Sequence, residues 1–101
     1  MPPPPPPVRT IVHEKIVIGT VPVTPSPALV ANATRAWFRF DDGPVRVRLD
    51  NVDPDASTGT RLFDADQREF THEELAGLRM IRAGSQDGVA QATYYGRFPA
   101  I

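Results

Sequence analysis

The residues that could support catalysis in this chain are its two histidines, its serines and its glycine pairs. His13 and His72 each precede a glutamate, but neither belongs to a His-x-x-x-His or similar spacing that binds zinc. No serine lies in a Gly-x-Ser-x-Gly elbow, and Gly84 and Gly88 bracket a loop without a phosphate-binding pattern. The chain has no cysteine, which excludes thiolate nucleophiles and disulfides. These patterns favour a protein that is not an enzyme and holds no cofactor.

The stretch 53–59 (DPDASTG) has oxygen-bearing side chains at alternate positions, as calcium loops do. An EF-hand loop needs glycine at its sixth position and glutamate at its twelfth, whereas counting from Asp53 gives Thr58 and Asp64. Short Asp and Ser side chains commonly stabilise turns by bonding their own backbone, and we interpret the stretch in this way. The alternative is a calcium-dependent binding module whose ligands are Asp53, Asp55, Ser57 and Asp64.

Arginine and tryptophan occupy alternate positions over 35–48. Both types are favoured anchors in protein–protein interfaces, and both can also stack on nucleic-acid bases. The chain has 11 basic and 12 acidic residues, so it lacks the positive field that binds phosphate backbones. An ordinary exposed face, with arginines paired to Asp50 or Glu69, remains the other interpretation. The predicted protein-contact face consists of Arg35, Trp37, Arg39, Arg46 and Arg48.

Six consecutive prolines follow Met1, and they are Pro2, Pro3, Pro4, Pro5, Pro6 and Pro7. Proline fixes φ and removes the backbone donor, so this stretch predicts a polyproline II rod of about 19 Å. Such a rod is either a solvated tail or an arm that lies on a neighbouring subunit. In the second case the contacts extend into the following strand, to Val8, Ile11 and Ile16.

The hydrophobic pattern predicts short strands that must position these residues. The β-branched stretch 8–18 reads as a strand, 21–27 is a proline-rich edge or connector, and 28–32 resumes pairing. Apolar residues alternate in 34–40 and 45–50 around Asp41-Asp42-Gly43-Pro44, which predicts a hairpin. A second hairpin joins 78–83 to 89–95, and 60–63 and 68–70 are short extended pieces. Thr71 and Glu74 fit a capping box that starts a single helical turn.

About seven short strands and no long helical pattern predict an all-β fold, a small antiparallel β-sandwich or barrel with one short helical turn. We divide the chain into a polyproline arm (1–7), an N-terminal strand or arm (8–20) and a sandwich domain (21–101). A body of about 90 residues buries only about 60–65% of its surface, so oligomerisation would help it. Ten of the 12 acidic residues lie in 41–74, which predicts one acidic end. No segment has the ~18 consecutive apolar residues of a membrane span.

The stretch 21–96 resembles a loose family of small phage-encoded β-sandwich structural proteins. The similar features are a Val-Thr-Pro opening at 23–25, RAWFRF at 35–40, VRVRLD at 45–50, STG at 57–59, LRMIRA at 78–83 and VAQATYYG at 89–96. Asp64-Ala65-Asp66 replaces the frequent Pro-Gly of this family, and the hexaproline arm is a further departure.

The resemblance implies a virion structural protein, made in a host cytoplasm and located in the virion. It implies a capsid decoration or cement protein that binds the major capsid protein as a homo-oligomer, with a trimer as one form. A head-fibre base and a tail or head-to-tail accessory protein are the alternative positions within the virion, and the partner is then another virion protein. Neither a nucleic acid nor a membrane is an expected partner.

Overall fold

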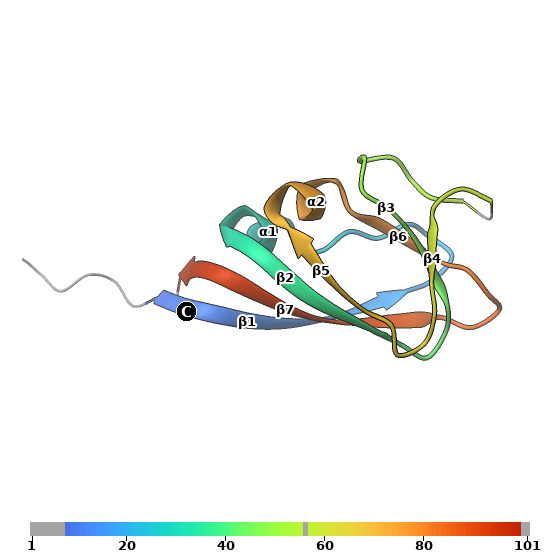
Figure 1. Cartoon of the computed structure of the whole chain (residues 1–101), viewed down its shortest axis with the longest axis horizontal. Helices are drawn as coiled ribbons and strands as arrows, with labels where there is room; N and C mark the ends of the chain where they lie inside the picture. The colour runs from blue at the N-terminus through green and yellow to red at the C-terminus, as the bar shows by residue number, and fades with distance from the viewer. Residues whose placement is uncertain (1–7, 56, 100–101) are drawn as a thin grey trace, which may run out of the picture.

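The computed structural model describes residues 8–55 and 57–99 and confirms a small all-β sandwich. Seven strands form two antiparallel sheets, and two short helices cover one end of the sandwich (Figure 1). The elements are β1 (Val8–Ile18), α1 (Pro27–Asn32), β2 (Ala33–Asp41), β3 (Val45–Arg48), β4 (Thr60–Leu62), β5 (Gln67–Thr71), α2 (His72–Gly77), β6 (Arg79–Arg82) and β7 (Gly88–Pro99). The predicted polyproline arm lies outside the described residues.

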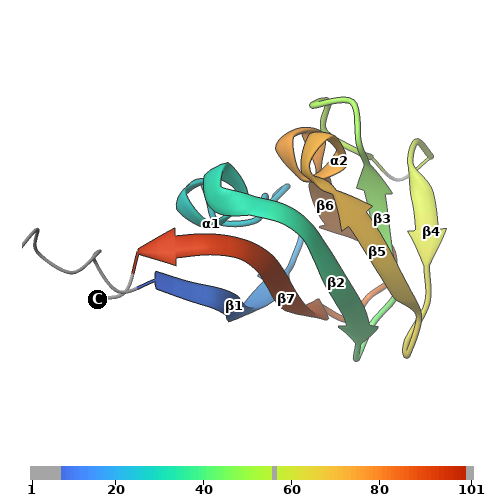
Figure 2. The same ribbon diagram turned by 60° about the vertical axis from the view of Figure 1, so that its left-hand side comes forward.

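One sheet has the strand order β1-β7-β2-β5 and the other has the order β4-β3-β6 (Figure 2). The first and last strands of the chain are therefore neighbours, paired from Val8 opposite Pro99 to Ile18 opposite Gly88. The predicted connector 21–27 runs beside β6, where Val23 forms an isolated bridge with Met80. This proline-rich stretch has only one paired position, because its prolines lack the backbone N–H that strand pairing requires.

The core lies between the two sheets and follows the predicted alternation. In β2, the fully buried residues are Ala36, Phe38 and Phe40. In β3, Val45 is fully buried and Val47 is only 2% exposed. The Phe38 ring is the centre of this core, with ring centroids 5.0 Å from Phe70 and 6.0 Å from Tyr94. The two-residue period therefore identified the buried side of these strands correctly.

Both predicted hairpins are wrong, because each pair of strands is divided between the two sheets. β2 pairs with β5 and β7, whereas β3 pairs with β4 and β6, so the turn at 42–44 crosses from one sheet to the other. The same holds for the loop between β6 and β7. A crossing and a hairpin bury the same alternate side chains, so periodicity cannot distinguish them.

The two crossing turns pack against each other at one end of the sandwich. The Ala83 amide donates to the Pro44 carbonyl at 2.8 Å. A Cβ on Gly43 would lie only 2.5 Å from the Gln86 carbonyl, so a glycine is needed at this close approach. The turns are thus held by contacts between them that are distant in sequence.

The expectation of an extended segment at 28–32 is also wrong, because these residues form α1. The Ser26 carbonyl accepts from the amides of Leu29 and Val30 at 3.1 and 3.0 Å, and Pro27 opens the helix where no donor is needed. The second helix, α2, begins as predicted. The Thr71 hydroxyl accepts from the Glu74 amide at 3.3 Å, and the Glu74 carboxylate accepts from the Thr71 amide at 3.0 Å, which confirms the capping box.

Candidate protein-binding surfaces

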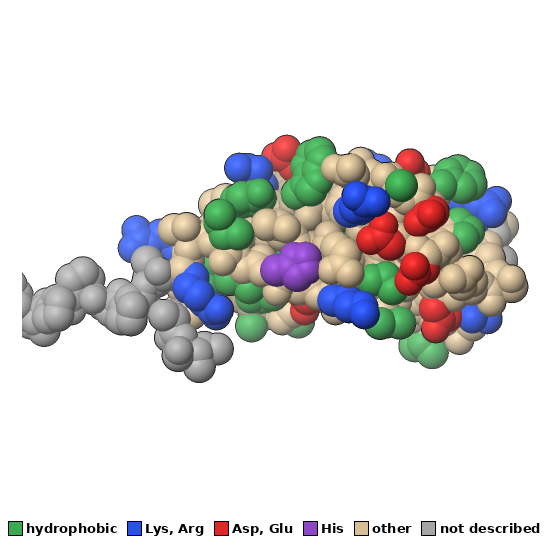
Figure 3. Space-filling model, turned by 90° about the horizontal axis from the view of Figure 1, so that it is seen from below, with side chains coloured by type: hydrophobic (Ala, Val, Ile, Leu, Met, Phe, Trp, Pro, Cys, Tyr) green, Lys and Arg blue, Asp and Glu red, His purple; other side chains and the backbone are tan. Residues whose placement is uncertain are grey.

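The outer side of the β1-β7-β2-β5 sheet carries four of the predicted contact residues, and we call it the outer face. The register places its side chains in rows across the strands, with Ile11, Tyr95 and Arg35 in one row and His13, Thr93 and Trp37 in the next. Figure 3 looks onto the side where β1 and β7 lie and shows hydrophobic and basic side chains interspersed around a histidine. The outer face is therefore mixed in character, as protein-binding surfaces usually are.

Arg35, Trp37 and Arg39 lie together on this face, and neighbouring side chains hold each of them. The Arg35 guanidinium lies 4.0 Å above the centre of the Tyr95 ring and 4.0 Å from the Glu69 carboxylate. Trp37 donates from Nε1 to Gln67 at 3.0 Å but stays 40% exposed. Side chains that are exposed yet already fixed lose less conformational entropy when a partner covers them.

The remaining two arginines of the predicted contact face lie on the other sheet. The prediction that all five residues form one surface is therefore wrong. Arg46 and Arg48 belong to β3 and project from the other sheet, because the chain crosses the sandwich at 42–44. Arg46 donates to the Gly59 carbonyl at 3.2 Å. Arg48 pairs with Asp50, and this hydrogen bond holds the pKa of Asp50 below its ordinary value.

The predicted contacts of β1 divide according to the two sides of the strand. Ile11 lies on the outer face and is 58% exposed, so a partner can reach it. Ile16 has the opposite parity, lies in the core and is only 8% exposed, so its side chain is not part of the outer face. Val8 begins the strand, and Pro2 to Pro7 lie outside the described residues.

The edge of β1 is a second accessible feature. Within residues 8–55 and 57–99, β7 is the only strand that pairs with β1, so one side of an 11-residue strand keeps unpaired backbone groups. Val17, like Ile11, is a large exposed hydrophobic residue of this strand, at 56%. Long open edges of this kind are templates for pairing with another chain.

Aspartates gather at the end where the crossing turns meet. Asp41, Asp42, Asp64, Asp66 and Asp87 all lie at or beside these turns. In Figure 3 the acidic side chains collect toward the end away from the chain termini. The Asp42 amide donates to the Asp64 carboxylate at 3.0 Å, which places two of the turns side by side.

The predicted calcium ligands have protein partners. Asp53 pairs with Arg79 at 2.7 Å, and Asp55 accepts from the amides of Ser57 and Thr58, both at 2.8 Å. These hydrogen bonds also lower the pKa of Asp55. In the part of the chain that the structure describes, no three His, Cys, Asp or Glu side chains form a group that could hold a metal ion.

The two histidines take part in separate local contacts. His13 on the outer face bonds the Gln91 side chain at 2.8 Å, and the ring of His72 lies 2.9 Å from the Ala33 carbonyl. The Ala33 carbonyl can only accept, so Nδ1 of His72 is the donor. Neither histidine approaches a serine or cysteine in the contacts of the described residues.

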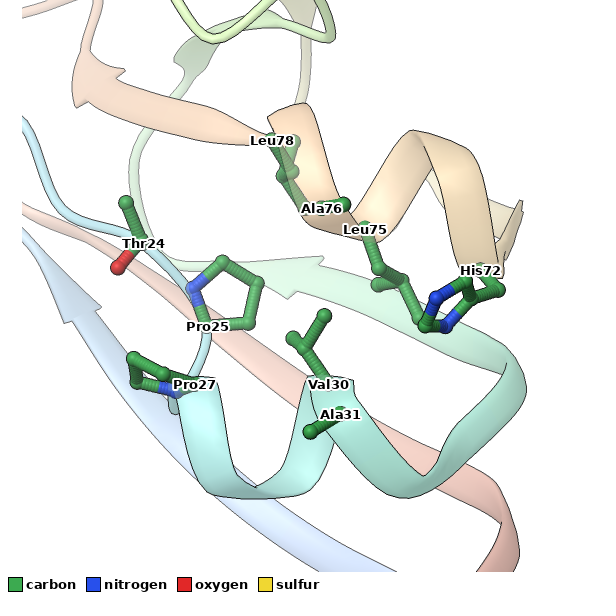
Figure 4. Close-up of a pocket in the computed structure, with 9 residues that line it drawn as sticks. All are labelled: Thr24, Pro25, Pro27, Val30, Ala31, His72, Leu75, Ala76 and Leu78. Carbon is green, nitrogen blue, oxygen red and sulfur yellow. The ribbon is translucent and has the colours of Figure 1, made fainter.

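A pocket between α1 and α2 was not found by the sequence reasoning. Its volume is about 420 Å³, and Figure 4 shows Pro25, Val30 and Leu75 pointing into it, with His72 at its margin. Its walls are mainly apolar, and the Nδ1 atom of His72 already bonds the protein backbone. The pocket was missed because the stretch 28–32 was interpreted as extended.

No known protein family has a model that matches this chain, and no curated protein matches it. Both described helices are too short to cross a membrane.

Proposed function

We propose that this protein is a virion structural protein that decorates or cements a capsid by binding the major capsid protein through the outer face. The virion setting rests on the family resemblance of the stretch 21–96. The binding surface rests on one observation, namely that Trp37 stands exposed between Arg35 and Arg39 on a four-stranded sheet. A tryptophan flanked by arginines is the composition of an interface centre.

The charges of the outer face favour a protein over a nucleic acid as the partner. Arg39 pairs with Asp41 at 3.0 Å, and Arg35 lies near Glu69. These pairs reduce the positive field that phosphate backbones require. The paired guanidinium groups can exchange these partners for carboxylates and amides of a bound protein at the margin of an interface.

The test is a binding measurement with capsid particles that lack this protein. We expect Trp37→Ala to weaken binding by about 30-fold, because the truncation of a central interface tryptophan costs about 2 kcal/mol. Co-sedimentation of the variant with the particles over a concentration series measures the change. Imaging of the labelled protein on the particles distinguishes a position on the head from one on the tail.

Phe63→Ala is the matched control for this experiment. Phe63 is also a large exposed aromatic residue, at 54%, but it lies between β4 and β5 and away from the outer face. We expect this variant to bind as the unaltered protein does. Equal binding by both variants, with both folded, would rule out Trp37 as the centre of the interface.

A further inference from the structure

We infer that the open edge of β1 is a contact between two copies of this chain, in which β1 pairs antiparallel with the β1 of the second copy about a two-fold axis at Glu14. The pairing joins two four-stranded sheets into one sheet of eight strands. It closes after two copies and therefore predicts a dimer. This inference goes beyond the proposed attachment to a capsid and does not depend on it.

β1 is the most suitable of the sheet edges for such a contact. The other edge of its sheet, β5, has five residues, and the β4 edge of the second sheet has three. The β6 edge is partly covered, because Val23 bridges Met80. β1 has 11 residues, contains no proline and is interrupted only by a register shift between Arg9 and Ile11. The run 11–18 is thus a long regular edge without proline or a bulge, and its charged residues are Lys15 and the inward-facing Glu14.

The side chains of β1 on the outer face are arranged symmetrically about Glu14. They read Ile11, His13, Lys15 and Val17, with hydrophobic residues at both ends and basic types between them. Antiparallel pairing centred on Glu14 places Ile11 opposite Val17 of the second copy, and this contact occurs twice. The two most exposed hydrophobic residues of the strand, at 58% and 56%, would cover each other.

The inner side of the strand fits the same register. With the axis at Glu14, Val12 lies opposite Ile16 of the second copy, so an apolar pair again faces an apolar pair. An axis at His13 would place Ile11 opposite Lys15 and Val12 opposite Glu14, and an axis at Lys15 would place two lysines opposite each other. Of these three axes, only the one at Glu14 pairs apolar residues on both sides of the strand, and such matching fixes strand register.

The two Glu14 side chains face each other at the axis, and the structure supplies groups that moderate their repulsion. The Tyr94 hydroxyl donates to Glu14 Oε1 at 2.7 Å, and the Ser26 amide donates to the same oxygen at 3.2 Å. Both donors belong to the same copy as the carboxylate that they bind. They hold each carboxylate toward its own sandwich and away from the axis.

Charge substitutions test the dimer and its register together. We expect the unaltered protein to have twice the mass of one chain in sedimentation equilibrium. Ile11→Glu or Val17→Lys alone should weaken dimerisation by about tenfold, because each change affects two symmetry-related pairs. The double variant should recover, because glutamate then faces lysine at both contacts. A monomeric unaltered protein, or a double variant weaker than either single variant, would overturn the inference.

Val21→Lys is the control for these substitutions. Val21 is 72% exposed but lies in the connector after β1, so the same new charge should leave the mass unchanged. Circular dichroism of each variant separates a loss of pairing from a loss of folding. Trp37 lies on β2, two strands from the edge. The effect of Trp37→Ala on particle binding should therefore be the same whether or not the protein dimerises.

Cross-linking gives an independent measure of the register. The chain has no cysteine, so a single introduced cysteine has no competing partner. A mixture of Ile11→Cys and Val17→Cys proteins should form a disulfide between the two, because directly opposite positions have suitable Cα separations. Neither protein alone should cross-link at a comparable rate. Efficient cross-linking of Ile11→Cys with itself would refute the axis at Glu14.

Discussion

At the residue scale, the hydrogen bond from the Tyr94 hydroxyl to Glu14 joins a buried core residue to a carboxylate of β1. Burial raises the pKa of Tyr94, and the hydrogen bond to Glu14 and the charge of its carboxylate raise it further. We expect Tyr94→Phe to lower the free energy of unfolding by about 1–2 kcal/mol, because a hydrogen bond to a charged acceptor is lost. Urea denaturation measures the change. Tyr95→Phe is the control, since Tyr95 lies on the outer face and should have little effect.

The same tyrosine makes a specific contribution to the pH dependence of stability. In the unfolded chain its pKa is about 10, whereas in the folded protein it is higher. Its contribution is therefore complete below pH 10 and is lost as the pH rises from there through the folded pKa. The unaltered protein should lose stability above pH 10 more steeply than Tyr94→Phe does. Identical slopes for the two proteins would contradict the raised pKa.

At the scale of elements, the close contact between β7 and the end of α1 determines which residue can stand at Gly96. A Cβ there would clash with the Asn32 carbonyl and lie 2.9 Å from the Cα of Ala33. We expect Gly96→Ala to lower the free energy of unfolding by about 1–3 kcal/mol, as overpacking does. Thermal unfolding of Gly19→Ala is the comparison, because a Cβ there would lie 3.6 Å from the Asp87 side chain, an ordinary contact.

The elements also show what the sequence could and could not reveal. The alternation of Phe38, Phe40, Val45 and Val47 predicted the strands and their buried sides correctly. It could not reveal that β2 and β3 belong to different sheets, because both arrangements bury the same residues. That choice depends on the packing of Gly43 and Pro44 against the loop at 83–87, which is distant in sequence.

The error in the candidate site follows from the same cause. Once β2 and β3 were interpreted as one hairpin, Arg46 and Arg48 were assigned to the surface of Arg35 and Trp37. The parity of β1, by contrast, was available in the sequence. Ile16 lies two residues from Ile18, which is fully buried, and an odd number of residues from Ile11. Applying the two-residue period to this strand places Ile16 and Ile11 on opposite sides, so the two side chains cannot belong to the same face.

At the scale of the whole molecule, the sandwich depends on pairing between the two ends of the chain. β1 contributes Ile18 and Ile16 to the core and occupies one full side of β7. We expect removal of residues 1–18 to abolish cooperative unfolding, because it exposes this part of the core and leaves β7 at the edge. Removal of residues 1–7 should leave the melting temperature unchanged and weaken attachment to capsid particles.

Circular dichroism and particle binding of the two truncated proteins test this prediction. A folded protein without residues 1–18 would show that β1 is dispensable for the sandwich. Unchanged particle binding without residues 1–7 would show that the prolines do not form a docking arm.

The exposed loop between β3 and β4 has a practical consequence. Asn51, Asp53, Asp55 and Ser57 are exposed, and the loop leaves the sheet opposite the one that carries Trp37 and β1. Exposed loops of this kind tolerate insertions well. A foreign epitope grafted there would project from the back of each subunit while the attachment surface stays free, so that a coated particle would present it in many copies.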